Sequence, residues 1–275
     1  KGLIGKDIKR MNLAIDKIAE TGQPQSFFIK RRQLEIAANP PASKSIADNV
    51  IGILEGSDSR LKNEYIVVSA HYDHLGVVDG EIHNGADDNA SGSAALILAA
   101  NRLRGMKLKR SIIFLWDSGE EKGLLGSGHY VKHPNVPLEQ IVANVNIDMI
   151  SPNDENTIGV IPSQGDGVTT MNALIHKINR KKKHNMTLRK DMDRFHTRSD
   201  HYNFYKAGVP AIFFFSDTHD DYHQPADDWE KVNYKKLTKF YVMFEDFIVA
   251  LANERHAPKF TSRDASHGTG ASPSN

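Results

Sequence analysis

Short apolar runs recur along the chain and alternate with longer segments whose apolar residues have helical spacing. The runs are rich in Val, Ile and Phe, which is typical of strands buried on both faces of a sheet. They predict strands over residues 25–37, 49–54, 65–70, 111–116, 141–147, 157–161 and 210–215. The segments with helical spacing predict helices within residues 1–22 and over residues 91–106, 123–132, 166–182 and 234–254.

The alternation of strands and helices predicts the fold class. We expect an α/β three-layer sandwich, in which a mixed, mostly parallel central sheet has helices on both faces. We expect a single domain over residues 1–257, with residues 1–48 as an N-terminal extension packed on it. From Pro258 onward Ser, Gly, Pro and Asn dominate, so residues 258–275 are predicted to be a disordered tail.

Composition narrows the class of protein. The 275 residues are 39% hydrophobic and 25% charged, as in globular proteins. The formal net charge of +1 gives no electrostatic case for a nucleic-acid partner. No apolar run approaches the ~18–20 residues of a membrane span. The chain begins at Lys1 without Met or a signal segment, and we interpret it as a processed or excised piece of a longer precursor.

Candidate metal ligands directly follow three of the predicted strands. They are His71, Glu120, Glu121 and Asp148. Ligands of open α/β sheets bind beyond the carboxyl ends of the strands, so these side chains are predicted to meet at one edge. The chain has no Cys, which leaves His and carboxylates as metal ligands. That combination suits Zn²⁺ and similar cations.

Several of these candidates also have a structural interpretation. Asp87 and Asp88 lie just before a predicted helix, where Asp, Asn and Ser commonly cap the N terminus, so Asp87, Asn89 and Ser91 could each be the cap. Glu120 and Glu121 are flanked by apolar residues, which favours a neutralising cation over two solvated glutamates. For Asp148, inside an apolar run, metal binding and a hydrogen-bonded structural role both stay open.

Other His and Asp residues carry a weaker signal. Residues 219–228 hold two His and four Asp, which for most of them is typical of a surface loop. Ser199, Asp200 and His201 are the residue types of a hydrolase triad, but triad members come from distant segments, so we interpret them as capping and packing residues. The remaining histidines considered are interpreted as structural or exposed: His74, His83, His129, His133, His176, His184 and His196.

A series of ordered motifs between residues 49 and 252 resembles the zinc aminopeptidases of peptidase family M28. The motifs are AHYDHL at 70–75, GADDNASG at 85–92, EEKGLLGS at 120–127, NIDM at 146–149, RSDH at 198–201 and YHQP at 222–225. The resemblance implies two Zn²⁺ ions per chain. By this resemblance, the ligands of one ion are His71 and Asp148, those of the other are Glu121 and His223, and Asp88 bridges both.

The resemblance also implies catalytic roles. Glu120 is expected to be the general base and acid, and Tyr222 to hydrogen-bond the tetrahedral intermediate. Asp73 is expected to orient His71 through its carboxylate. A cis peptide bond between Asp88 and Asn89 is expected from the same family pattern.

The implied function is hydrolysis of the N-terminal residue from peptides by a hydroxide that bridges the two metals. The substrate is then a peptide with a free N terminus, and the location is secreted or periplasmic in a bacterium. Bacterial relatives often carry a protease-associated domain, and this chain is expected to begin after one.

The alternatives are a related dizinc carboxypeptidase or dipeptidase, a glutaminyl cyclase-like enzyme, and a binding module that lost its metal. Retention of both His71 and Asp148 argues against the cyclase, and filled positions for all five ligands argue against the binding module.

Overall fold

The computed structural model describes residues 7–27, 46–181 and 183–261, in two compact units that divide after Ile46. In the first unit, the predicted N-terminal helix is confirmed as α1 (Ile8–Thr21). It ends at Gly22, whose left-handed backbone lets its N–H bond the carbonyl of Ile18. The strand predicted over 25–37 lies mostly outside the described residues, and packing of residues 1–48 on the second unit stays a prediction.

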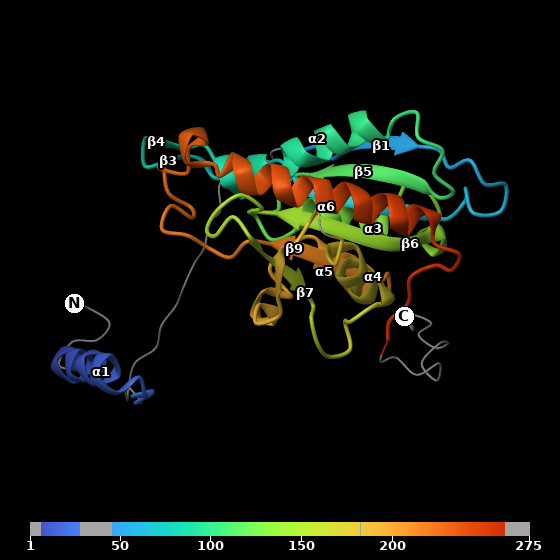
Figure 1. The fold of residues 1–275 in the computed structure, drawn as a ribbon. Coiled ribbons are helices and arrows are strands. Elements are labelled where there is room, and N and C mark those ends of the chain that lie inside the picture. The colour runs from blue at the N-terminus through green and yellow to red at the C-terminus, as the bar shows by residue number, and fades with distance from the viewer. Residues whose placement is uncertain (1–6, 28–45, 182, 262–275) are drawn as a thin grey trace. The chain divides into compact units, whose positions relative to one another are not determined.

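A seven-stranded mixed sheet organises the second unit (Figure 1). The strand order is β1-β5-β2-β6-β9-β7-β8. The strands are β1 (Val50–Leu54), β2 (Tyr65–His71), β5 (Ser111–Asp117), β6 (Ile141–Asp148), β7 (Thr157–Ile161), β8 (Thr187–Arg189) and β9 (Ala211–Phe215). Neighbours from β5 through β2 and β6 to β9 are parallel, whereas β1 and β7 pair antiparallel with β5 and β9. The predicted mixed, mostly parallel sheet is therefore confirmed.

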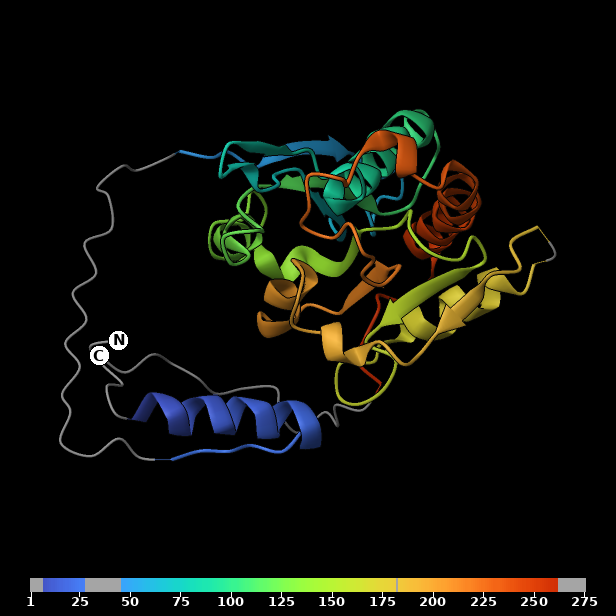
Figure 2. The same cartoon turned by 90° about the vertical axis from the view of Figure 1, so that its left-hand side faces the viewer.

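Helices cover both faces of this sheet (Figures 1 and 2). One face carries α2 (Gly92–Leu103), α4 (Thr170–Asn179) and α6 (Tyr234–Asn253), and the other carries α3 (Leu125–Lys132) and α5 (His201–Lys206). Successive strand residues point to opposite faces. Ile66 and Val68 of β2 accordingly join the core under α2 and α6, while Val67 joins the core under α3 and α5. The three-layer sandwich predicted from the sequence is confirmed.

Short elements complete the second unit. The wide helical turn η2 (Ala86–Ser91) leads into α2, and its Asp88 and Asn89 leave helical geometry. Three single turns of helix are η3 (Leu138–Gln140), η4 (Asp193–Phe195) and η5 (Trp229–Lys231). None of the described helices combines the length and apolar character needed to cross a membrane.

Three local features differ from the pattern-based expectation. The hairpin of β3 (Gly76–Val78) and β4 (Glu81–His83) was not predicted, because its strands are short and mostly exposed. Strand β8 is equally short and was also missed. Helix α4 begins four residues later than predicted, because Thr169 and Asn172 form a reciprocal capping box there.

The boundary of the predicted tail also moves. Residues 258–261 are ordered against the start of α4: the N–H of Thr170 donates to the carbonyl of Lys259 at 2.9 Å, and Phe260 pairs with Thr169 in an antiparallel bridge. Composition alone missed this, because the pairing depends on backbone hydrogen bonds that any sequence can make. Residues 262–275 lie outside the described residues.

Candidate metal centre

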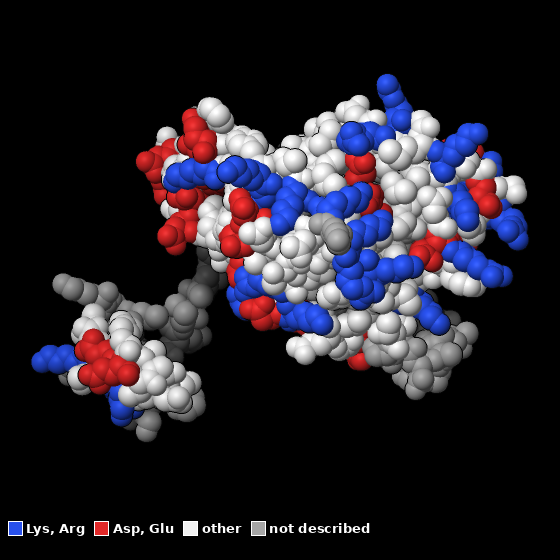
Figure 3. All heavy atoms as spheres, viewed as in Figure 1, with Lys and Arg blue, Asp and Glu red and all other residues white. Residues whose placement is uncertain are grey.

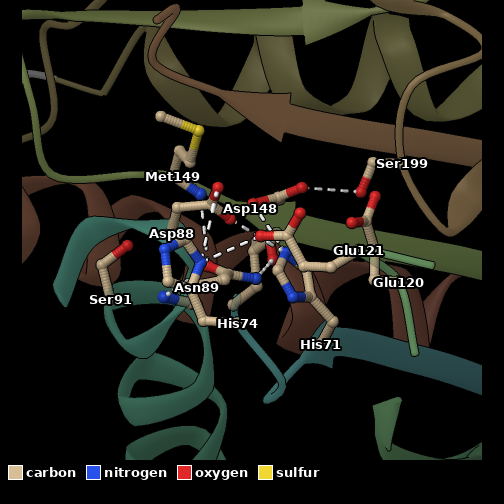
Figure 4. Close-up of polar contacts among 12 residues, drawn as sticks. His71, His74, Asp88, Asn89, Ser91, Glu120, Glu121, Asp148, Met149 and Ser199 are labelled. Carbon is tan, nitrogen blue, oxygen red and sulfur yellow. Dashed lines mark hydrogen bonds and ion pairs between the residues drawn. The ribbon is translucent and has the colours of Figure 1, made fainter. Parts of the chain in front are cut away.

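The carboxyl ends of two parallel strands and the turn η2 bring the first candidate ligands together. In the parallel pairing of β2 and β6, Ser69 lies opposite Asn146. Two residues further along each strand, His71 and Asp148 end the two strands side by side. Nε2 of His71 lies 3.2 Å from Oδ1 of Asp148 and 3.3 Å from Oδ1 of Asp88. These three side chains form a group that could hold one metal ion (Figure 4).

A second group lies beside the first and shares Asp88. Its members are His74, Asp88 and Glu121. Nδ1 of His74 is 2.9 Å from Oε1 of Glu121 and 3.8 Å from Oδ2 of Asp88. His223 approaches the same place, with Nε2 at 3.1 Å from both Oδ2 of Asp88 and Oε2 of Glu121. The two oxygens of Asp88 therefore face different groups.

His74 is the residue that sequence reasoning missed. It lies in the loop after β2, only 7% of its side chain is exposed, and it contacts two predicted ligands, so of the two interpretations from the sequence the structural one fits and the exposed one does not. Its sole signal in the sequence is its position three residues after His71, which no periodicity argument could use. The five predicted ligands, by contrast, all lie within these contacts.

The donor chemistry of both groups fits a divalent cation. Oε1 of Glu121 and both ring nitrogens of His74 are buried and make no hydrogen bond. Unsatisfied buried polar atoms are costly, and a cation there would satisfy Oε1 of Glu121 together with Nδ1 of His74, which lies beside it. Imidazoles and carboxylates are a donor set that Zn²⁺ accepts.

The titration of the buried side chains points the same way. Burial raises the pKa of Glu120 to about 9, and the neighbouring carboxylates of Asp148 and Asp200 add to this although His71 opposes it. Burial also works against ionised Asp88, but hydrogen bonds from His223 and His71 hold its pKa well below the usual range. Carboxylates crowded in this way favour a cation, which lowers their pKa values.

The surface around this edge of the sheet is acidic. On the face drawn in Figure 3, Lys and Arg side chains lie along the region of α6, whereas Asp and Glu gather at the end near β3 and β4. That hairpin follows the carboxyl end of β2, where the candidate ligands begin. An acidic surface attracts metal cations and substrate ammonium groups.

Asp73 positions the paired glutamates. Its carboxylate accepts hydrogen bonds from the backbone N–H of Glu120 at 3.1 Å and of Glu121 at 3.3 Å. Nδ1 of His71 instead lies 3.1 Å from the backbone carbonyl oxygen of Asp73, and 3.8 Å from its carboxylate. The expected orientation of His71 by the carboxylate is thus replaced by a contact with the main chain.

Ser199 fastens the remaining oxygen of Asp148. Its hydroxyl donates to Oδ2 of Asp148 at 2.8 Å and accepts from the side-chain amide of Asn146 at 2.8 Å. The hydrogen-bonded role that the sequence left open for Asp148 is therefore present, and its other oxygen, Oδ1, lies in the group that could hold a metal ion. The next residue but one, His201, stacks on Phe213 and makes no triad with Ser199.

The loop that carries His223 is hydrogen-bonded to the segment that carries Asp88. The Asp227 carboxylate accepts from the backbone N–H of Asp87 at 2.9 Å and of Asp88 at 3.1 Å. Asp87 itself accepts from the N–H of Ser151 at 3.0 Å and does not cap α2. Two loops distant in sequence are thus held together at the shared carboxylate.

The side chain that hydrogen-bonds the first turn of α2 belongs to Asn89 and not to Asp87 or Asp88. Its side-chain oxygen accepts from the N–H of Gly92 at 3.0 Å. The cis peptide bond expected between Asp88 and Asn89 is present.

A small cavity of about 70 Å³ opens beside the two groups. Its walls include Asp88, Glu120, Asp148, Met149, Phe195, Arg198, Phe213, Phe215, Thr218 and Tyr222. The Tyr222 ring stacks on His223 with 3.9 Å between centroids. Burial, and then the carboxylates of Asp88 and Glu121, raise the pKa of Tyr222 to about 12, so its hydroxyl stays a donor at neutral pH.

Known proteins resemble this chain over the part that carries the site. Peptidase family M28 matches residues 49–248. Aminopeptidase YwaD of Bacillus subtilis (strain 168) is 27% identical over 198 residues, which are 70% of this chain and 42% of that protein. A probable leucine aminopeptidase of Trichophyton verrucosum (strain HKI 0517) is 30% identical over 205 residues, 70% of this chain and 55% of that protein.

A solved structure agrees with these matches. BSAP, a zinc aminopeptidase from Bacillus subtilis, superposes with a TM-score of 0.62 at 25% identity, covering 75% of this chain and 50% of that one. The chain therefore spans about half the length of the relatives it matches. The matched range contains every candidate ligand, and it shows that this chain belongs to peptidase family M28.

Proposed function

We propose that this chain is the catalytic part of a zinc aminopeptidase, which removes the N-terminal residue from peptides. The observation that carries the proposal is Asp88, whose two oxygens face two separate groups of His and carboxylate side chains. The relatives named above are aminopeptidases, which supports the same activity. From the family resemblance we also propose a location in the periplasm or outside a bacterial cell.

We assign two zinc ions to these groups. His71 and Asp148 would hold one, Glu121 and His223 the other, and Asp88 both. His74 is a further donor beside Glu121. Zinc bound there would polarise a peptide carbonyl and make a water molecule acidic enough to lose a proton near neutral pH.

The side chains around the cavity would then divide the remaining work. Glu120 takes the proton of the attacking water and passes it to the leaving amine. Its buried position next to other carboxylates favours proton uptake. The Tyr222 hydroxyl donates to the carbonyl oxygen as negative charge develops on it. The substrate's free α-ammonium group lies near the metal-binding carboxylates, and this requirement restricts cleavage to the end of the peptide chain.

Metal analysis and a substrate panel test the proposal. The purified protein should contain about two zinc ions per chain and cleave leucine p-nitroanilide but not its N-acetyl form. Glu120→Gln should keep its zinc and lose roughly 10²–10⁴-fold in kcat. Glu139→Gln, at an exposed glutamate, is the matched control and should behave as wild type.

Other outcomes contradict the proposal. A protein that binds no zinc at saturation is not a metallopeptidase. Cleavage of N-blocked peptides alone would indicate another exopeptidase, and cyclisation of N-terminal glutaminyl peptides would indicate the cyclase. Full activity of Glu120→Gln would show that another group is the base.

A further inference from the structure

Arg198 is a cationic side chain on the wall of the cavity at the candidate metal centre. The aromatic rings of Phe195, Phe213 and Phe215 line the same cavity. The backbone N–H of Arg198 donates to the carbonyl of Phe195 at 2.9 Å, which fixes where the side chain starts. The cavity thus combines apolar walls with a charged side chain that is exposed to solvent, so a molecule from solution can reach the guanidinium.

Two other arginines nearby differ from Arg198 in their partners. Arg189 binds Asp217 at 3.0 Å, and Arg194 binds the same carboxylate at 3.2 Å. Within residues 46–181 and 183–261, no carboxylate lies within ion-pair distance of the Arg198 guanidinium, and no hydrogen bond joins it to another residue. Arg198 therefore has its donors available for a molecule that enters the cavity.

The proposed zinc ions, which rest on the proposed function, would draw on the carboxylates of Asp88, Glu121 and Asp148. Arg198 is the one Lys or Arg among the described residues that line the cavity, so its positive charge stays there for an incoming anion. A planar guanidinium binds a carboxylate through two parallel hydrogen bonds, which a neutral amide cannot match.

We propose that Arg198 binds a carboxylate of the substrate, so that this site prefers peptides with a carboxylate close to the scissile bond. The carboxylate has two possible sources. It is the C terminus of a dipeptide, or it is the side chain of an acidic residue at the cleavage site. Arg198 is then a specificity-determining residue for short or acidic peptides.

Matched substrate pairs separate the two sources. Leu-Gly is compared with Leu-Gly amide for the C-terminal carboxylate, and glutamyl p-nitroanilide with glutaminyl p-nitroanilide for the side chain. In at least one pair, wild type should favour the carboxylate member. Arg198→Met should reduce that preference about tenfold or more, mainly through KM. Arg198→Lys should keep part of it, since charge remains but the paired donors do not.

Arg104→Met removes an exposed positive charge elsewhere and should leave both ratios unchanged. Equal losses on both members of each pair in Arg198→Met, or no charge preference in wild type, would overturn the inference. If wild type cleaves neither these pairs nor leucine p-nitroanilide, the proposed aminopeptidase function fails. Calorimetric binding of Leu-Gly and Leu-Gly amide to wild type and Arg198→Met then still decides whether Arg198 binds the carboxylate.

Discussion

The two groups that meet at Asp88 are built differently. His71 and Asp148 end two neighbouring strands, and their side chains are 1% and 9% exposed. In the other group Glu121, His74 and His223 come from loops, and the His223 side chain is 32% exposed. The first group is therefore fixed by the sheet and the second by contacts between loops. Ligands on rigid elements are held more accurately than ligands on loops.

This difference decides what each group needs in order to bind metal. The strand-end group has Ser199 to hold Asp148, while the loop group depends on Asp73 beneath Glu121 and on Asp227 beside Asp88. We expect the strand-end group to tolerate changes in its surroundings, and the loop group to lose affinity when a supporting residue is altered. The following predictions test that contrast.

The largest effect should follow loss of the shared carboxylate. Because its oxygens face both groups, Asp88→Ala should reduce zinc content from about two per chain to near zero and activity to background. Plasma emission spectrometry of dialysed protein measures the metal. Asp166→Ala, at an exposed position, is the control. Two retained zinc ions in Asp88→Ala would disprove the shared role.

Single histidine variants should separate the groups. His71→Ala and His223→Ala should each lose one zinc ion at saturating metal, from the strand-end and loop groups respectively. His74→Ala should keep both ions but bind the second about 10–100-fold more weakly, as a supporting residue does. Competition with a fluorescent chelator measures these affinities. If His74→Ala loses an ion while His223→Ala keeps both, the roles of the two histidines are reversed.

A smaller effect is expected from weakening the hydrogen bonds between Asp227 and the segment that carries Asp88. The Asp227 carboxylate accepts from two consecutive backbone N–H groups, and an amide offers only one oxygen for them. Asp227→Asn should therefore weaken zinc binding about tenfold at the loop group and less at the strand-end group, which shares Asp88 but has His71 and Asp148 fixed on strands. Asp228→Asn alters the neighbouring carboxylate, which bonds Asn84 instead, and serves as the control. Equal weakening at both groups would show general destabilisation.

Acid should destabilise the folded chain through the buried His201, which stacks on Phe213 of β9. Burial lowers the pKa of His201, two residues after Ser199, to about 3. The unfolded chain takes up this proton near pH 6.5 and the folded chain does not, so stability falls as pH falls from about 6.5 to about 3. Between pH 7 and pH 4, metal-free wild type should lose about 3 kcal/mol more than His201→Phe, measured by urea unfolding. Parallel losses would contradict this.

The contrast between the strand-end group and the loop group also explains which parts of the site could be predicted from the sequence. Apolar runs identify β2, β5 and β6, and the residues that follow them identify His71, Glu121 and Asp148, because strand ends of a parallel sheet share one edge. The loop contacts have no such rule. The contact of His74 with Glu121 and the hydrogen bond of Asp227 to Asp88 join segments that are far apart in the sequence. No local spacing encodes such contacts.

The family resemblance supplied His223 where spacing alone could not. The residues after β9 are rich in His and Asp, and their composition favoured a solvated loop. Short elements such as the β3–β4 hairpin were missed for a related reason, since three-residue strands leave too few positions to form a pattern.

The position of β9 has a consequence for how the chain folds. This strand follows β7 and β8 in sequence but lies between β6 and β7 in the sheet, and it leads directly into the segment that carries His223. The loop group therefore cannot close until β9 has inserted, a non-local step that is slow compared with helix formation. In refolding, we expect zinc uptake at this group to lag behind the recovery of helical circular dichroism. During synthesis, the ribosome must release the chain well past residue 223 before the centre can mature.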